Sequence, residues 1–266
     1  MYAFSYRAVT SIEEAVAALK ADEEAKFLAG GMTILPTMKI RLASPTQLIA
    51  LDKLPQLVGV SREDNALVIG AMTRHAQVAG DVRVRETIPA LACLASQIGD
   101  PQVRNRGTLG GSVANNDPAA DYPAALLGLG ATVYTDRRAI GADDFFTGMF
   151  ETALAPDELV VRVSFPIPTR AAYAKFPNPA SGYAVVGVMV AQTSSGTRVA
   201  VTGAGQHVFR VPQMERALGQ RFSEEVLTGI GVPAEVALNE DLHASAAYRS
   251  HLVGVMARRA VAAAGG

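Results

Sequence analysis

The sequence predicts an α+β protein built from three successive segments. In the first two segments, short apolar runs of strand length alternate with runs of helical periodicity, which is typical of α/β subdomains. After about residue 170, strands come first and helices follow, which favours an antiparallel sheet packed against helices. The pattern breaks near residues 55 and 170, so the expected divisions are 1–55, 56–169 and 170–266.

The first segment is predicted to be a small βαβ-like subdomain. Ser11 and Glu14 form a capping-box pattern at the start of "SIEEAVAALK", whose apolar residues then fall on one helical face. The stretch "AKFLAGG" is typical of a short buried strand that ends at a glycine pair, Gly30 and Gly31. The stretch "TILPTMKIRL" predicts a second helix, with Pro36 tolerated in its first turn, and "QLIAL" predicts the next strand.

The second segment is predicted to open with two strands, "LVGV" and "ALVIGAMT", on either side of the turn "SREDN". Helical patterns follow at "RHAQVAGD" and "IPALACLASQ". We expect a glycine-rich loop within residues 104–123 and a helix from about Pro118 to Leu129. The stretches "ATVYTD" and "ELVVRVSFPIP" predict the strands that close this segment.

The third segment is predicted to contain a sheet and then helices. The stretches "AYAKF", "YAVVGVMVAQT" and "TRVAVTGAG" predict strands, and the short turn between the last two suggests a hairpin. Helical patterns follow near 211–219, 223–230 and 244–263.

The composition argues against several classes of function. The chain has 24 basic and 25 acidic side chains, so a net charge of −1 gives no electrostatic reason to expect nucleic-acid binding. No apolar run approaches the roughly 20 residues that span a bilayer, and the start of the chain has no signal-peptide pattern. The lone Cys93, expected to be a small buried residue of a helix, can neither form an internal disulfide nor hold an iron–sulfur cluster, which fits a reducing cytoplasm. The four histidines show no metal spacing, so no metal site is expected, and His75 is expected to be structural or to face solvent, with cofactor contact as a less favoured alternative.

Two glycine pairs are candidate anion sites, "LAGGMT" at 28–33 and "GTLGGS" at 107–112. Glycine adopts positive φ and has no Cβ to block a ligand, and successive backbone N–H groups can surround a phosphate without lysine or arginine. Two such loops could hold the two phosphates of a dinucleotide, with hydroxyl donors from Thr33 and Thr108. Either pair alone could equally be an ordinary tight turn, and neither matches the Rossmann or P-loop pattern.

Further candidate ligand contacts lie in "NNDPAADYP", which begins at Asn115. Asp117 could simply cap the next helix, with Pro118 at its first position. Capping does not explain Asp121, whose carboxylate could hold a ribose hydroxyl or an adenine amine. Farther along the chain, Lys175 could lie near an electron-rich ring edge and Tyr183 could stack on a flat ring, although a solvated lysine and a half-buried tyrosine are the simpler interpretations.

Taken together, these stretches resemble one known family. "FLAGGMTILPTMK", "IGAMTRHAQVA", "IGDPQVRNRGTLGGSVANNDPAADYPAALLGLGATV" and "VAVTGAG" are similar to the FAD-binding medium subunit of molybdenum hydroxylases, a family that includes the medium chain of aerobic carbon monoxide dehydrogenase and the FAD domain of xanthine dehydrogenase. The resemblance covers nearly the whole chain. It implies a two-subdomain FAD-binding domain of the vanillyl-alcohol-oxidase (PCMH) type, followed by a C-terminal antiparallel sheet with helices.

The resemblance also implies which residues contact FAD, whereas no catalytic residue is implied. The first pyrophosphate loop matches Ala29–Thr33, the second matches Thr108–Gly111, the acidic contact matches Asp121, and the lysine and stacking tyrosine match Lys175 and Tyr183. The implied cofactor-binding residues are therefore Ala29, Gly30, Gly31, Met32, Thr33, Thr108, Gly110, Gly111, Asn115, Asp117, Asp121, Lys175 and Tyr183. Met32 departs from the family, which commonly has a polar residue there, so a side-chain contact at this position is in doubt.

The resemblance finally implies an electron path and partners. Electrons would pass from a large molybdopterin-binding subunit through the [2Fe–2S] clusters of a small subunit to FAD, and then to quinone, NAD or O2, in a dimer of heterotrimers. Two alternatives stay open: a self-sufficient flavin-dependent oxidoreductase of the same fold, and a non-enzymatic nucleotide-binding or scaffold protein in which the glycine pairs are only turns.

Overall fold

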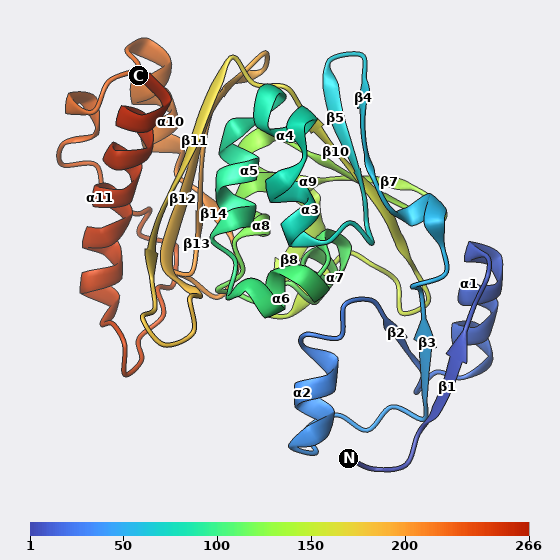
Figure 1. Ribbon diagram of the computed structural model, residues 1–266. Helices are drawn as coiled ribbons and strands as arrows, with labels where there is room; N and C mark the ends of the chain where they lie inside the picture. The colour runs from blue at the N-terminus through green and yellow to red at the C-terminus, as the bar shows by residue number, and fades with distance from the viewer. Residues whose placement is uncertain (266) are drawn as a thin grey trace.

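The computed structural model describes residues 1–265 and arranges them in three units that follow one another along the chain (Figure 1). The N-terminal unit consists of β1 (Ser5–Ala8), α1 (Ile12–Ala21), β2 (Lys26–Leu28), α2 (Ile34–Lys39) and β3 (Gln47–Ala50). Its three strands form a parallel sheet in the order β1-β3-β2. The predicted capping box is confirmed in part: the Ser11 hydroxyl accepts the N–H of Glu14 at 3.1 Å, but the Glu14 carboxylate accepts the N–H of Thr10 at 2.9 Å rather than that of Ser11, and α1 begins at Ile12.

The central unit contains a five-stranded antiparallel sheet in the order β4-β5-β10-β6-β7 and a layer of short helices. Its elements are η1 (Pro55–Leu57), β4 (Val60–Glu63), β5 (Ala66–Gly70), α3 (His75–Gly80), α4 (Val82–Thr87), α5 (Pro89–Ser96), α6 (Pro101–Arg106), α7 (Leu109–Asn115), α8 (Tyr122–Leu129), β6 (Thr132–Thr135), β7 (Ala139–Gly141), α9 (Ala142–Phe145), β8 (Phe146–Gly148), β9 (Glu151–Thr152) and β10 (Val160–Pro166). Every residue of α8 is buried, which explains why its sequence is apolar all round.

The stretch expected to be a glycine-rich loop is mostly helical, and this prediction was wrong. Gly110 and Gly111 lie in the first turn of α7, because Thr108 caps that helix, and Asn116 ends it in the left-handed conformation with a φ of 43°. Asp117 does not cap α8: its carboxylate accepts the N–H of Ala119 at 2.9 Å in a separate turn, so α8 begins four residues later than expected.

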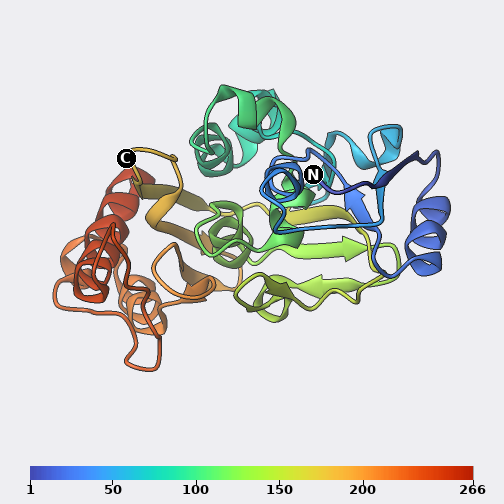
Figure 2. The same cartoon turned by 90° about the horizontal axis from the view of Figure 1, so that it is seen from below.

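The C-terminal unit is a four-stranded antiparallel sheet in the order β11-β12-β13-β14, covered on its outer face by two helices (Figures 1 and 2). Its elements are β11 (Arg170–Pro177), β12 (Ala184–Thr193), β13 (Gly196–Thr202), β14 (Phe209–Arg210), α10 (Pro212–Gln220), η2 (Glu225–Leu227) and α11 (Ala246–Gly265). The hairpin β12–β13 is confirmed. The helix expected over 223–230 is wrong beyond the short turn η2, because Gly229 takes a φ of 78° and ends it.

The central and C-terminal units share one hydrophobic core. Helix α8 packs on β12 and β13 so closely that a Cβ at Gly128 would lie 2.6 Å from the side chain of Met189. The same core cluster contains Ala200 of β13, whereas a smaller cluster around Ile49 and Leu54 joins the N-terminal unit to Leu57, Met72 and Leu159 of the central unit. Among the helices of residues 1–265, none combines the length and apolarity needed to cross a membrane. Cys93, expected to be buried, is exposed.

Candidate cofactor site

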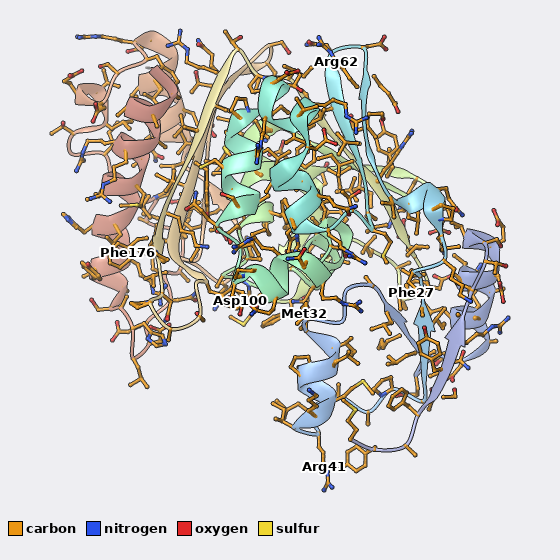
Figure 3. All side chains as sticks on the ribbon, in the orientation of Figure 1. Phe27, Met32, Arg41, Arg62, Asp100 and Phe176 are labelled. Carbon is orange, nitrogen blue, oxygen red and sulfur yellow. The ribbon has the colours of Figure 1, made fainter. Side chains whose placement is uncertain are left out.

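The two glycine-rich segments, far apart in the sequence, lie directly against each other. A Cβ at Gly30 would lie 2.2 Å from the carbonyl oxygen of Arg106 and 2.8 Å from the Cα of Gly107. A Cβ at Gly111 would lie 3.5 Å from the Cβ of Ala29. Figure 3 labels Met32, in the first segment, and Asp100, at the start of the helix α6 whose last residue, Arg106, takes part in this contact. The sequence prediction that both segments serve one site is therefore compatible with their positions.

The first segment, Ala29–Thr33, offers unused backbone donors. Gly31 has a φ of 75°, which turns the chain sharply between β2 and α2. Within residues 1–265, the N–H groups of Gly30, Gly31, Met32 and Thr33 donate no hydrogen bond to the backbone. The chain has no acidic residue between positions 25 and 51, so no carboxylate of this segment repels an anion. Such a run of free N–H groups in a turn suits a phosphate.

The second segment uses its backbone donors internally. The N–H groups of Leu109 and Gly110 donate to the carbonyl oxygens of Thr73 and Ala71 at 3.0 and 2.8 Å, and Gly111 N–H donates to the Thr108 hydroxyl at 3.2 Å. Thr108 and Gly110 are buried, whereas Gly111 is only half-buried. Among the described residues, only the N–H of Thr108 in this segment donates no hydrogen bond to the protein, so the segment mainly supplies a close wall beside the first one rather than a second set of free donors.

Asp121 and Lys175 are brought together, but inside the protein. The Lys175 ammonium donates to Asp121 Oδ2 and to the carbonyl oxygen of Gln97, both at 3.0 Å, and the Tyr173 hydroxyl donates to Asp121 Oδ1 at 2.5 Å. The side chains of Lys175 and Asp121 are 1% and 3% exposed. Burial raises the pKa of Asp121 against the opposing effects of Lys175 and Tyr173. These groups join α8 to β11. Because they are buried, they can affect a bound ligand only indirectly, through the positions of these two elements.

Sequence reasoning missed Tyr173 as the third member of this cluster. The signal was present, because residues 173 and 175 share one face of a strand with a period of two. It also missed the buried amide of Asn116, which donates to the carbonyl oxygens of Gly148 and Glu151 at 2.9 and 2.7 Å and fixes the β8–β9 hairpin. That contact could not be foreseen, because β8 and β9 carry no clear strand pattern.

Asp117 and Tyr183 meet at a pocket between the central and C-terminal units. Its volume is about 370 Å³. The pocket is also lined by Phe150, Asn178 and Arg249. Tyr183 is 46% exposed. The pKa of its hydroxyl is raised, mainly because the side chain is partly buried and secondly because the negative charge of Asp117 is near. Burial also raises the pKa of Asp117. An exposed aromatic ring beside a carboxylate suits a flat ring that carries N–H groups.

Asn115 is half-buried at the C-terminal end of α7, away from the pocket lining. Among the described residues, no group of three His, Cys, Asp or Glu side chains is placed to hold a metal ion. The arrangement as a whole offers an anion-binding turn, a close second wall and, at the other end of α7, a pocket for a flat ring. It therefore suits a nucleotide that joins a diphosphate to an aromatic ring system.

Two family models match the chain along almost its whole length. The first, the FAD binding domain in molybdopterin dehydrogenase, matches residues 2–168. The second, the CO dehydrogenase flavoprotein C-terminal domain, matches residues 171–264. These matches define a class, the flavin-binding subunits of dehydrogenases.

Individual relatives are similar over their full length. The nicotine 6-hydroxylase medium subunit of Paenarthrobacter nicotinovorans is 36% identical, over 99% of this chain and 98% of the relative. The carbon monoxide dehydrogenase medium chain of Hydrogenophaga pseudoflava is also 36% identical, over 98% and 96%. A solved structure of reconstituted CO dehydrogenase from Oligotropha carboxidovorans has a TM-score of 0.93 at 32% identity, over 99% of this chain and 98% of that one.

The chain therefore belongs to the family of FAD-binding medium subunits of molybdenum hydroxylases, as the sequence resemblance predicted. It is an FAD-dependent oxidoreductase subunit, and its cofactor is FAD. The residues present fit this group, because the first segment has free N–H groups and carries no acidic residue, and a Cβ at Gly30 would close the gap between the two segments.

Proposed function

We propose that this chain carries the FAD through which a molybdenum hydroxylase passes its electrons to an external acceptor. The observation that carries the proposal is the contact of the two glycine segments at Gly30 and Gly107, beside four unused backbone N–H groups. The likeness to medium subunits and medium chains supports partners of two kinds, a large molybdopterin-binding subunit and a small [2Fe–2S] subunit. A dimer of heterotrimers in the cytoplasm completes the proposal.

The proposed residue roles follow the geometry. The N–H groups of Gly30–Thr33 bind the diphosphate, and Thr108, Gly110 and Gly111 hold α7 close beside it. Asp117 and Tyr183 contact the ring system, whereas Asn115 lies outside the pocket lining and is given no contact in this proposal. Asp121 and Lys175 do not contact the cofactor in this proposal; their buried ion pair fixes α8 and β11 to each other. The FAD unit is of the PCMH type, with boundaries near 55 and 170; the last residue of the third segment, 266, lies outside the described residues.

The chain itself performs no acid–base step in this proposal. Bound FAD supplies the redox chemistry, accepting electrons and releasing them to quinone, NAD or O2. The protein's backbone donors offset the diphosphate charge, and the rigid joint between the central and C-terminal units keeps the ring pocket in place.

The test is the flavin content of the full chain, produced alone and together with its partner subunits. We expect the visible absorbance bands of a flavin, with FAD released on denaturation. Gly30→Ala should lose the bands, because its Cβ would collide with the backbone at Arg106. Gly219→Ala is the matched control, since a Cβ there meets nothing within 4 Å. A colourless wild-type protein in both preparations would overturn the proposal, and turnover by the chain alone would favour a self-sufficient oxidoreductase.

A further inference from the structure

We propose that His75 is a positioning residue that sets the spacing between the two glycine segments, and thereby the affinity for the diphosphate of the dinucleotide. The inference rests on the proposed function. It concerns a side chain that contacts neither the free N–H groups of the first segment nor the ring pocket.

Gly107 lies between the first glycine segment and His75. On one side, its Cα would be 2.8 Å from a Cβ at Gly30. On the other side, a Cβ at Gly107 would lie 2.5 Å from Nε2 of His75. The backbone N–H of His75 also donates to the carbonyl oxygen of Gly107 at 3.0 Å. The first segment therefore packs against Gly107, and Gly107 packs against the imidazole ring of His75.

The imidazole ring rests in turn on the protein core. His75 is 4% exposed, and its ring centroid lies 5.3 Å from that of Tyr122, which is fully buried. Tyr122 directly follows Asp121, whose carboxylate pairs with Lys175. A column of contacts thus connects the first segment, through Gly107 and His75, to the cluster that joins α8 to β11.

The hydrogen-bonding state of His75 indicates that its role is not local stability. Among residues 1–265, Nδ1 of His75 and the hydroxyl of Tyr122 have no hydrogen-bond partner. An unpaired buried polar group destabilises a fold relative to an apolar one of the same shape. Burial, together with the nearby Arg104 charge, lowers the pKa of His75 to about 4, so the ring adds no charge to the anion site at neutral pH. Its contribution is spatial: the ring is rigid, and its Nε2 edge lies directly behind Gly107.

Removing the ring should loosen this column and misalign the free N–H groups of the first segment. The loss should fall on the diphosphate and not on the ring system, because the ring pocket lies at the opposite end of α7. FAD and riboflavin therefore report the two regions separately, since riboflavin has the ring but no diphosphate.

The experiment measures the Kd of FAD and of riboflavin by flavin fluorescence, using cofactor-free full chain in the preparation in which the wild type binds FAD. His75→Ala should weaken FAD about tenfold or more, as the loss of one charge-assisted hydrogen bond would, and leave riboflavin unchanged. His75→Phe keeps a flat aromatic ring behind Gly107 and should therefore retain most of the FAD affinity. Val78→Ala, a buried position in the same helix, is the control for general damage to α3.

A compensating pair tests the contact itself and covers the case in which His75→Ala folds poorly. Gly107→Ala alone should weaken FAD, because its Cβ collides with Nε2 of His75. Adding His75→Ala should restore part of that affinity, because the new methyl group occupies space that the ring leaves. Equal loss of FAD and riboflavin, the same effect from Val78→Ala, or no recovery in the double variant would overturn the inference. A wild-type chain that binds no FAD in any preparation would instead overturn the proposed function.

Discussion

At the scale of single residues, the two glycines of "TLGGS" have different tasks although they are neighbours. Gly110 faces inward: a Cβ there would lie 2.5 Å from the Cβ of Ala71. Gly111 faces the first segment, where the nearest atom beyond its own helix cap is the Cβ of Ala29 at 3.5 Å. The sequence motif treats the pair as one feature, but only the folded contact shows that Gly110 permits packing and Gly111 permits access.

This difference predicts that substitutions at the two glycines affect different properties, the stability of the fold for Gly110 and the affinity for FAD for Gly111. Gly110→Ala should lower the free energy of unfolding by about 1–3 kcal/mol, as overpacking of a core does, whether or not FAD is present. Gly111→Ala should weaken FAD binding and lower the free energy of unfolding of the cofactor-free chain less than Gly110→Ala does, because its only close contact would be with the capping Thr108 hydroxyl, at 2.8 Å. Urea unfolding and FAD titration of both variants check this. A Gly110→Ala chain as stable as the wild type would show that α7 can shift away from β5.

His75 also makes a pH dependence predictable. Its pKa is about 4 in the folded chain against an ordinary value of 6.5, so the unfolded chain binds a proton that the folded chain does not between these pH values. Stability should therefore rise with pH through this window and level off above it, by about 3 kcal/mol in total. The difference in unfolding free energy between wild type and His75→Phe, measured from pH 4 to 7, isolates this effect. A difference that stays constant with pH would contradict it.

At the scale of elements, the buried pair of Asp121 and Lys175 joins α8 to β11. Lys175→Met should leave the Asp121 carboxylate buried without a cation, at a cost of about 3–5 kcal/mol in the free energy of unfolding. Adding Asp121→Asn should recover much of this loss, because no unpaired charge is then buried. Denaturant unfolding measures both variants.

The matched control is the exposed pair Lys20 and Asp157, with an N–O distance of 3.5 Å and 58% and 27% of the two side chains exposed. Lys20→Met should change stability by less than about 1 kcal/mol, because water screens this pair. Equal losses from Lys175→Met and Lys20→Met would mean that the inner pair is solvated in solution.

Sequence periodicity located the elements whose signals come from residues close together in the sequence. Helix α1 follows from its cap and apolar face, and the β12–β13 hairpin follows from two apolar runs around a short turn. Helix α7 escaped prediction because glycines disfavour a helix locally, and the Thr108 cap and the packing of Gly110 on Ala71 overrule that preference. Asp121 and Lys175 were both selected, but not as a pair, because they are 54 positions apart in the sequence and meet only in the folded chain.

At the scale of the whole molecule, the three units are unequally connected. The central and C-terminal units share a core that includes residues of α8, β12 and β13. The N-terminal unit packs around a smaller cluster that also contains Leu57, Met72 and Leu159 of the central unit, and Figure 1 shows α2 standing apart from the other helices. Ile40 and Leu42, at the end of α2, are 67% and 78% exposed. The sequence pattern predicts breaks near 55 and 170, but it could not show that a continuous core lies across the second one.

This inequality predicts where FAD stabilises the chain. In the cofactor-free chain, backbone hydrogen exchange should be fast across β1–β3 and α2 and slow in α8 and β12, because elements that pack on a small core open at lower free energy. Adding FAD should slow exchange most in residues 26–39, because the diphosphate would occupy the free N–H groups of the first segment and tie that unit to the central one. Hydrogen-exchange mass spectrometry with and without FAD measures this directly, and Gly30→Ala should abolish the added protection. Slowing that is uniform along the chain would mean instead that all three units already open together and that the N-terminal unit is not the weakly held part.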